Sequence, residues 1–341
     1  MDRHSSYKWR LDRWEKNGLW HPKMERGMKM ENKKSNFYSL IHKICREQGI
    51  TCRDYGDGWV FELSKKQKNS FIFGYQFGLN LSSVQQLCND KGAASEALEA
   101  HGIPHVHHIA YMCPPMQKFV GGDGCFQELL DVFAQEGGDL VVKDNEGTGG
   151  NLVFHVTSRK ALEQAAFAIF SSCRSIAVCP YYDILQEYRV VVLDGEVKLI
   201  FSKQRQCLQG DGVSNIRQLY AAYLLAGGKA EESIPESCMK QVLAKGERYP
   251  LNWKHNLGQG AGAVLFSREQ VPEVAELALQ AANILNVRFG SFDVIRTVDG
   301  IRILEVNTGV MMENLAGMSS EHYALVKEVY REAIEKMLAT V

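Results

Sequence analysis

Two Asp-Gly dipeptides, each flanked by apolar runs, constrain the fold of this chain more than any other feature of the sequence. The dipeptides are Asp194-Gly195 and Asp299-Gly300. The flanking runs are residues 188–193, 197–201, 289–296 and 301–306. A two-residue Asp-Gly connection is typical of a β-hairpin, because the tight turn needs residues that tolerate a positive φ. The sequence therefore predicts two antiparallel strand pairs.

Helices are predicted between and around these strand pairs. The predicted helices are residues 36–48, 82–100, 158–171, 216–225, 271–285 and 321–338. A third hairpin is predicted where residues 139–143 and 152–156 flank a glycine-rich turn. Strands that mostly pair as hairpins, with helices between them, predict an α+β (α/β) chain rather than a single doubly wound sheet.

Composition limits the partners and the compartment that we expect. The chain has 341 residues, which at about 150 residues per domain suggests two to three domains. Its net charge of −1 gives no global attraction for nucleic acid or for an anionic membrane. No run approaches the roughly 18 apolar residues of a membrane span. The nine cysteines are scattered without a CxxC pair, which suits the reducing cytoplasm. From charge, hydropathy and cysteines together, we expect a cytoplasmic protein with no nucleic-acid and no membrane partner.

The N-terminal segment, residues 1–36, is polar and basic and contains Trp9, Trp14 and Trp20. Basic residues interleaved with aromatic ones occur in nucleic-acid-binding segments. We favour the simpler interpretation, an arm that packs on its own protein. The segment has no apolar run, so we do not expect it to be a secretory signal.

Lys143 and the glycine-rich turn after it form the first candidate site. The turn reads Asn145-Glu146-Gly147-Thr148-Gly149-Gly150. A lysine at a strand end reaches a phosphate, and glycines let backbone N–H groups approach phosphate oxygens without a clash from Cβ. The order differs from a Walker A loop, in which the lysine follows the glycines. A hairpin turn with a solvated lysine explains these residues equally well.

Asp293, Glu305 and Asn307 form the second candidate site. Glu305 and Asn307 alternate along one predicted strand and so share a face, and Asp293 lies on the strand across the second Asp-Gly turn. Two carboxylates and an amide are hard oxygen ligands of the kind that suits Mg²⁺. The alternative is a strand-end hydrogen-bond pair. We favour the metal site, because the neighbouring residues are apolar and these polar groups stand where a core strand meets a site.

Three further cations are candidates for contact with a phosphoryl group. Arg189 opens a predicted strand, Arg205 precedes the sequence Gly210-Asp211-Gly212, and Lys254 lies in a polar turn over residues 254–261. Arginines at such places can clamp a phosphoryl group during transfer. Taken singly, the arginines are explained better as solvated surface residues, and the Lys254 turn equally well as a surface loop.

The histidines do not indicate a metal site by their spacing. His105, His107 and His108 are clustered, and His155 stands apart. None of them has a partner at metal-ligand spacing along the chain. We interpret all four as structural or solvated.

Taken in order, the segments over residues 80–316 resemble the ATP-grasp superfamily. Asn89-Asp90-Lys91 resembles the segment before the ATP-binding domain, and the resemblance implies that Lys91 contacts the nucleotide phosphates. It also implies that Lys143 and the glycine-rich turn cover these phosphates. The residues that the resemblance places at the adenine hinge are Cys179, Pro180, Tyr181, Tyr182 and Asp183. The metal ligands that it implies are Asp293, Glu305 and Asn307.

The resemblance implies a nucleotide held between two α+β subdomains, with a smaller N-terminal domain before them. The implied boundaries are residues 1–36 for the arm, 37–104 for the N-terminal domain, 105–183 for the lid subdomain and 184–341 for the C-terminal subdomain with the metal site. Arg205 and Gly210-Asp211-Gly212 are similar to the branch of ribosomal-protein glutamate ligases, cyanophycin synthetases and glutathione synthetases. Cys207 and Asn252 depart from that branch, which usually has Pro and Arg there, and Lys254 is a candidate for the missing charge.

The resemblance implies an ATP-dependent ligase that joins a carboxylate to an amine through an acyl-phosphate, with Arg205, Arg189 and Lys254 as catalytic cations. It implies ATP and Mg²⁺ as cofactors, with Mn²⁺ as a substitute ion, and small-molecule or peptide substrates such as amino acids. A kinase that phosphorylates a small alcohol or a polyol phosphate is the alternative. A nucleotide-binding regulatory module is disfavoured, because all three metal-ligand candidates are present. Both a monomer and a homodimer are left open.

Overall fold

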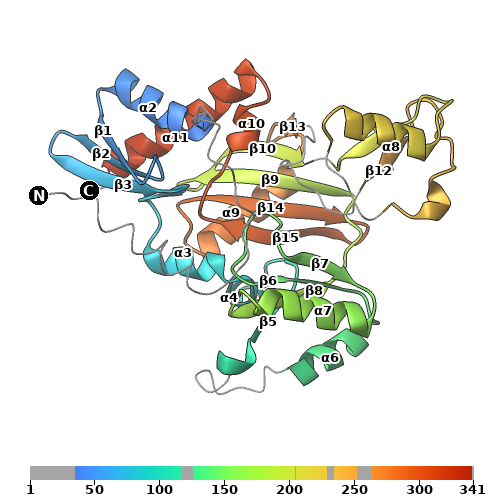
Figure 1. Ribbon diagram of the computed structural model, residues 1–341. Helices are drawn as coiled ribbons and strands as arrows, with labels where there is room; N and C mark the ends of the chain where they lie inside the picture. The colour runs from blue at the N-terminus through green and yellow to red at the C-terminus, as the bar shows by residue number, and fades with distance from the viewer. Residues whose placement is uncertain (1–34, 117–125, 204, 229–233, 252–262, 340–341) are drawn as a thin grey trace, which may run out of the picture. The chain divides into compact units, whose positions relative to one another are not determined.

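The computed structural model describes residues 35–116, 126–203, 205–228, 234–251 and 263–339. Helices pack on three antiparallel sheets of four or five strands and beside one short strand pair (Figure 1). The prediction of an α+β chain built from hairpins and helices is confirmed. In this described part of the chain, no helix is long and apolar enough to cross a bilayer.

The central sheet has the strand order β13–β10–β9–β14–β15, and every neighbouring pair is antiparallel (Figure 1). The strands are β9 (Gln186–Leu193), β10 (Glu196–Lys203), β13 (Ala263–Phe266), β14 (Phe289–Thr297) and β15 (Gly300–Asn307). Both predicted hairpins are confirmed, as β9–β10 and β14–β15. The second one turns one residue earlier than predicted, at Val298-Asp299, because Gly300 already pairs with Thr297 in β15. In the first one, Asp194 and Gly195 have φ values of 49° and 78°, the left-handed values that this turn requires.

One face of the central sheet is buried under α9 (Pro272–Ile284) and α3 (Ser82–Asn89). Tyr188, Val190, Phe292 and Val294 are among the strand residues in this core. Because side chains alternate along a strand, Arg189 and Asp293 point to the opposite face. That face carries the candidate site.

A second four-stranded sheet, here called the β6 sheet, has the order β5–β8–β6–β7. Its strands are β5 (Ile109–Met112), β6 (Leu140–Asp144), β7 (Val153–Val156) and β8 (Ser175–Pro180). The third predicted hairpin is confirmed as β6–β7. Helix α7 (Arg159–Phe170) packs on this sheet, and the Ser158 hydroxyl accepts a hydrogen bond from Ala161 N–H at its start. Strand β5 and helix α6 (Phe126–Gln135) were not predicted from the sequence.

The N-terminal sheet is the meander β1–β2–β3–β4. Its strands are β1 (Thr51–Tyr55), β2 (Val60–Lys65), β3 (Lys68–Phe73) and β4 (Gln76–Phe77). One face of it packs against α2 (Asn36–Gln48) and α11 (Ser320–Ala339) (Figure 1). Phe61, Ile72, Leu40 and Tyr330 share one core there. Segments near the two ends of the described chain, including α10 (Glu313–Ala316), therefore stabilise each other.

A smaller cluster forms around α8 (Ile216–Leu225) and the strand pair of β11 (Cys207–Gln209) and β12 (Arg248–Pro250) (Figure 1). Helix α8 has the bounds that the sequence predicts. Asn215 and Gln218 form a reciprocal capping box at its N-terminus, which fixes where the helix begins.

The prediction of one helix over residues 82–100 is wrong. Helix α3 ends at Asn89, and α4 (Lys91–Glu99) begins after Asp90, whose backbone is extended at φ −89° and ψ 107°. The Asp90 carboxylate accepts a hydrogen bond from Ala93 N–H and so caps α4, because a short acidic side chain competes with the helix for backbone donors. The break places Lys91 in the first turn of α4.

Candidate active site

A cavity of about 670 Å³ lies on the face of the central sheet that points away from α9. Its walls come from the central sheet, the β6 sheet and the N-terminal sheet. The volume falls within the roughly 300–1,000 Å³ of pockets that hold small molecules. Most of the residues predicted to bind nucleotide and metal line this cavity, in a polar band between two apolar ends.

The predicted phosphate loop forms one wall of the polar band. Gly147, Thr148, Gly149 and Gly150 all line the cavity. A Cβ added to Gly147 would lie 2.8 Å from the Asp144 side chain, and Gly149 and Gly150 have φ values of 72° and 76°. The chain can follow this path only with glycine or with strain.

Asn145 and Lys91 tie the loop to the first turn of α4. The Asn145 side chain is fully buried, and its Oδ1 accepts a hydrogen bond from Gly92 N–H at 3.1 Å. Lys91 Nζ donates to the carbonyl oxygens of Asn145 (3.2 Å) and Gly147 (2.7 Å) and lies 3.6 Å from Glu305 Oε1. Burial lowers the pKa of Lys91, and the Glu305 carboxylate works against that shift.

Lys143 gives the clearest sign of an anionic ligand. Its side chain lines the cavity and is only 7% exposed. Among the described residues, no acceptor forms a hydrogen bond or an ion pair with Lys143 Nζ. Burying an ammonium group without a partner is costly, so a negative group bound in the cavity would stabilise the folded site.

A β-bulge turns the metal-ligand candidates toward the cavity. Asp293 pairs with Glu305, and the register shift beside this pair leaves Leu304 as an extra residue in β15. As a result, Leu304 and Glu305 both line the cavity, whereas Ile303 lies in the core against α9. Asn307 lines the cavity as well, so Glu305 and Asn307 share a face as the sequence predicts.

Asp293 is already engaged by Arg189. Arg189 Nε lies 2.7 Å from Asp293 Oδ1, and Nη2 lies 2.8 Å from Oδ2. Burial opposes the charge of Arg189, but the Asp293 carboxylate holds its pKa above the ordinary value. Each carboxylate oxygen still has a second lone pair, so a metal would share Asp293 with Arg189 rather than replace it.

The predicted adenine hinge lines one apolar end of the cavity. Cys179, Pro180, Tyr181 and Tyr182 are the hinge residues in its wall. Val106, Val141, Ile295 and Leu304 surround them in a small cluster of their own. Tyr181 N–H donates to the carbonyl oxygen of Asp139, which fixes the hinge to the start of β6. An apolar slot of this kind fits a flat ring system.

The residues at the other end of the cavity were not predicted from the sequence. Trp59, Phe73 and Tyr75 of the N-terminal sheet line this aromatic end, together with Met311 beyond β15. The Trp59 ring packs edge-to-face on Phe73 and on Tyr75, with centroid distances of 6.3 Å in both pairs. These residues precede the segment that carries the family resemblance, and nothing in the local pattern links them to Met311. Glu187 was also missed, although alternation places it on the face of Arg189.

Among the described residues, three of the predicted site residues, Glu146, Asp183 and Arg205, do not line the cavity. Glu146 pairs with Arg174 at 3.4 Å. Arg205 Nη2 donates to the carbonyl oxygen of Ile184 at 2.9 Å and lies 3.8 Å from Asp183 Oδ1. Lys254 and its polar turn lie outside the described residues. The roles predicted for these residues stay predictions.

Comparison with solved structures decides the fold. A bifunctional glutathione synthetase from Pasteurella multocida superposes with a TM-score of 0.53 at 14% sequence identity, over 88% of this chain and 44% of that chain. The chain has the ATP-grasp fold. A D-alanine–D-alanine ligase from Bacillus anthracis superposes with a TM-score of 0.49 at 17% identity, over 74% of this chain and 68% of that chain.

The sequence comparisons reach less of the chain. A tetrahydromethanopterin:alpha-L-glutamate ligase from Methanocaldococcus jannaschii is 34% identical over 73 residues, which are 21% of this chain and 24% of that protein. The chain thus spans less than half the length of the glutathione synthetase and matches about a quarter of the glutamate ligase. No protein-family model matches the chain.

The ATP-grasp fold implies a nucleotide and Mg²⁺, and the described residues fit both. The buried, unpaired Lys143 and the glycine loop fit phosphate oxygens. Glu305 and Asn307 offer oxygen ligands on one face of β15. The apolar end around Tyr182 fits adenine.

Proposed function

We propose that this chain is an ATP-dependent ligase that joins a carboxylate, on an amino acid or a peptide, to an amine through an acyl-phosphate. The order of groups along β15 and its continuation carries the proposal. Leu304 lies at the hinge end, Glu305 and Asn307 lie in the polar band, and Met311 lies at the aromatic end. A nucleotide seated at the hinge would therefore end beside a space that is free for a second substrate.

The proposed reaction has two steps. A carboxylate oxygen of the first substrate attacks the γ-phosphorus of ATP, and the bond from that phosphorus to the bridging oxygen of ADP breaks. The amine nitrogen of the second substrate then attacks the acyl carbon, loses a proton, and displaces inorganic phosphate. The protein supplies no nucleophile, so positioning and electrostatic stabilisation carry the rate.

The residues of the polar band have separate parts in this proposal. Lys143 and Lys91 would offset the negative charge of the triphosphate, and Glu305, Asn307 and Asp293 would hold Mg²⁺. Bound Mg²⁺ would neutralise charge on the phosphate oxygens. The loop over residues 147–150 would exclude water, which protects an acyl-phosphate from hydrolysis.

The catalytic cations of the proposal are Arg189, Arg205 and Lys254. Arg189 faces the cavity and would orient Asp293. Arg205 would contact the transferring phosphoryl group, which requires its guanidinium to leave the carbonyl oxygen of Ile184. Lys254 would assist Arg205.

The aromatic end favours a second substrate with an apolar or planar part. Trp59 and Phe73 are 53% and 60% exposed, although large aromatic side chains are usually covered. Both line the cavity next to the polar band. Exposed rings beside a reaction site are typical of surfaces that a ligand covers.

The test is a phosphate-release screen of pairs of amino acids and short peptides with MgATP, followed by trapping with hydroxylamine. An acyl-phosphate formed from acid and MgATP alone should yield a hydroxamate without the natural amine. With ¹⁸O in the carboxylate of the acid, labelled oxygen should appear in the released phosphate. A phosphorylated alcohol as product, with no hydroxamate, would instead support a kinase.

Arg205→Ala should reduce hydroxamate formation by about 10²–10³-fold, because charge develops on the phosphoryl oxygens in this step. Arg159→Ala is a matched control, since Arg159 lies on α7 with its side chain 70% exposed. Amide formation without transfer of ¹⁸O to phosphate would contradict the proposed mechanism.

A further inference from the structure

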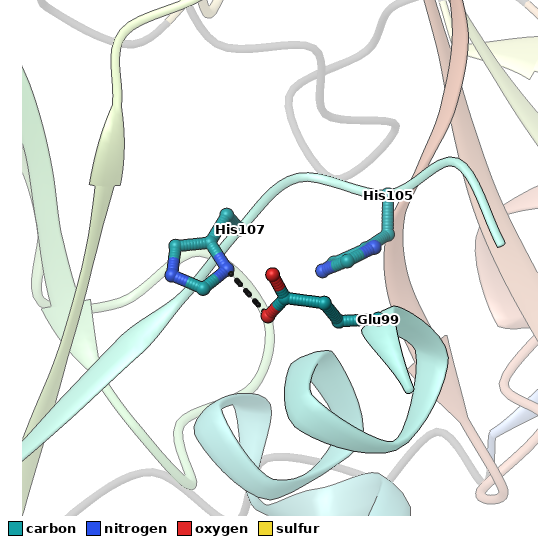
Figure 2. Close-up of side chains that lie close together, drawn as sticks. All are labelled: Glu99, His105 and His107. Carbon is teal, nitrogen blue, oxygen red and sulfur yellow. Dashed lines mark ion pairs between the residues drawn. The ribbon is translucent and has the colours of Figure 1, made fainter. Parts of the chain in front are cut away.

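Three side chains beside the nucleotide cavity form a cluster that the proposed ligase reaction does not use. Glu99 ends α4, and His105 and His107 lie on the segment between α4 and β5. Each side chain offers one ligand atom, and these atoms all lie within 4.8 Å of one another. Figure 2 shows the three side chains pointing toward each other. Val106, between the two histidines, lines the nucleotide cavity, so the cluster lies directly behind that wall.

The tautomer of His105 is fixed by the backbone. Its Nδ1 lies 2.8 Å from the carbonyl oxygen of Ile103. A carbonyl oxygen only accepts, so Nδ1 carries the proton, and Nε2 of the neutral ring carries a lone pair. In the described structure, Nε2 is buried and has no hydrogen-bond partner. A backbone carbonyl that holds the far nitrogen in this way is the usual outer partner of a metal-ligating histidine.

A carboxylate and a second imidazole lie close to this lone pair. The Glu99 carboxylate accepts and does not donate, so it and His105 Nε2 approach each other favourably only around a cation. His107 Nδ1 lies 3.3 Å from Glu99 Oε2 (Figure 2). Two ligands bound at about 2.0–2.1 Å in a tetrahedral site lie roughly 3.3 Å apart. The pair therefore stands at the spacing that two ligands of one metal ion have.

We propose that Glu99, His105 and His107 bind one divalent metal ion of the zinc class, with water in the fourth position. Two imidazole nitrogens and one carboxylate oxygen are a common ligand set for Zn²⁺ and its neighbours, whereas Mg²⁺ prefers oxygen ligands alone. The side chains of Glu99 and His107 are 60% and 48% exposed, so an ion reaches the site directly from solvent.

The position of the site indicates a stabilising role rather than a part in the reaction. An ion there fastens the C-terminal end of α4 to the segment that carries Val106 into the nucleotide cavity. Val106 N–H donates to the carbonyl oxygen of Ile303 at 2.8 Å, and α4 begins with Lys91, which holds the glycine loop. The ion thus fastens one end of α4 to a wall of the nucleotide site, while Lys91 at the other end of α4 holds the glycine loop.

The test is a Zn²⁺ titration of the full chain by calorimetry, in excess Mg²⁺ so that oxygen-ligand sites are filled. His107→Ala and Glu99→Gln each remove one exposed ligand, so both variants should fold. His101→Ala is the matched control, because His101 is an exposed histidine on α4's C-terminal side whose Nδ1 contacts the carbonyl oxygen of Ala97. All of these variants keep every cysteine, so zinc bound to thiols is the same in each.

The wild-type protein and His101→Ala should bind one Zn²⁺ that His107→Ala and Glu99→Gln bind at least about tenfold more weakly. Co²⁺ at the same site should give visible absorption bands in the first two proteins and lose them in the others. Zn²⁺ should also raise the thermal midpoint of the wild type but not of His107→Ala. Equal Zn²⁺ binding by all four proteins, or none by the wild type, would overturn the proposal.

Discussion

Arg189 and Asp293 form a bidentate ion pair on the cavity face of the central sheet, with N–O distances of 2.7 Å and 2.8 Å. The register of β9 and β14 pairs the two residues directly, so the sheet itself holds the guanidinium against the carboxylate. Asp293 is 3% exposed, so its carboxylate is buried against the Arg189 guanidinium. The pair therefore holds two opposite charges in the polar band in a fixed geometry before any ligand binds.

Arg189→Met should destabilise the fold by about 3–5 kcal/mol, because it leaves the Asp293 carboxylate buried without its cation. Adding Asp293→Asn to that variant should recover part of the loss, since the buried charge is removed. The measurement is urea unfolding at neutral pH. Arg159→Met, at an exposed position, should stay within about 0.5 kcal/mol of the wild type. If Arg189→Met alone were as stable as the wild type, Arg189 and Asp293 would not form a buried ion pair that stabilises the fold.

Glu305→Ala should reduce phosphate release by at least about 10²-fold, because it removes a proposed Mg²⁺ ligand from the reaction site. The fold should remain, because Glu305 faces the cavity and not the core against α9. Activity is followed as phosphate release and folding as the circular dichroism spectrum. Glu163→Ala on the exposed face of α7 is the control. If Glu305→Ala released phosphate at the wild-type rate, Glu305 would not be a ligand of Mg²⁺ in the reaction.

Lys91→Met should mobilise the glycine loop, because Lys91 Nζ donates to the carbonyl oxygens of Asn145 and Gly147. Hydrogen exchange over residues 145–150 should be faster in this variant than in the wild type. In the wild type, a non-hydrolysable MgATP analogue should slow exchange in the same residues. Lys160→Met, at an exposed lysine of α7, should leave this segment unchanged. If hydrogen exchange over residues 145–150 were the same in both variants and in the wild type with and without the analogue, the segment would be a rigid turn. Lys91 would then not be what holds it.

The features that the sequence predicts correctly are local ones. Both hairpins of the central sheet are predicted from their Asp-Gly dipeptides, although only Asp194-Gly195 forms the two-residue turn itself and Gly300 belongs to β15. Alternation places Glu305 and Asn307 on one face, because side chains in a strand repeat every second residue. The glycine loop after Lys143 is recognisable for the same reason, since its residues are neighbours in the chain.

The features that the sequence analysis missed depend on competition or on distant contacts. The helix predicted over residues 82–100 breaks where the Asp90 side chain caps a second helix, and the spacing of apolar residues does not show that competition. The pairing of Arg189 with Asp293 joins residues 104 positions apart, and the sequence suggested a different role for each. The aromatic end is a further case, because an isolated bridge between Gln76 and Gly309 brings the N-terminal sheet to the end of β15.

Cys88 should resist alkylation in the native protein, because burial raises the pKa of its thiol to about 12. Because the fold favours the neutral thiol, Cys88 contributes fully to the free energy of unfolding below pH 9. This contribution is lost as pH rises toward 12. Iodoacetamide at pH 8.5, followed by peptide mass spectrometry, should label the partly exposed Cys238 and leave Cys88 unmodified. In urea, iodoacetamide should label both Cys88 and Cys238. Equal labelling in the native protein would show that α3 opens readily.

Trp59→Ala should weaken binding of the non-nucleotide substrate and leave ATP binding unchanged. The Trp59 ring is held by Phe73 and Tyr75 but is not covered by them, so a substrate at the aromatic end would pack on it. Because such an aromatic contact contributes about 0.5–1.5 kcal/mol, KM for that substrate should rise roughly two- to tenfold. Phe71→Ala is the matched control, since Phe71 is 52% exposed on the same strand as Phe73 but does not line the cavity. Steady-state phosphate release, with each substrate varied in turn, separates the two KM values. If Trp59→Ala raised KM for ATP as much as for the other substrate, or if Phe71→Ala had the same effect, the second substrate would have to bind elsewhere.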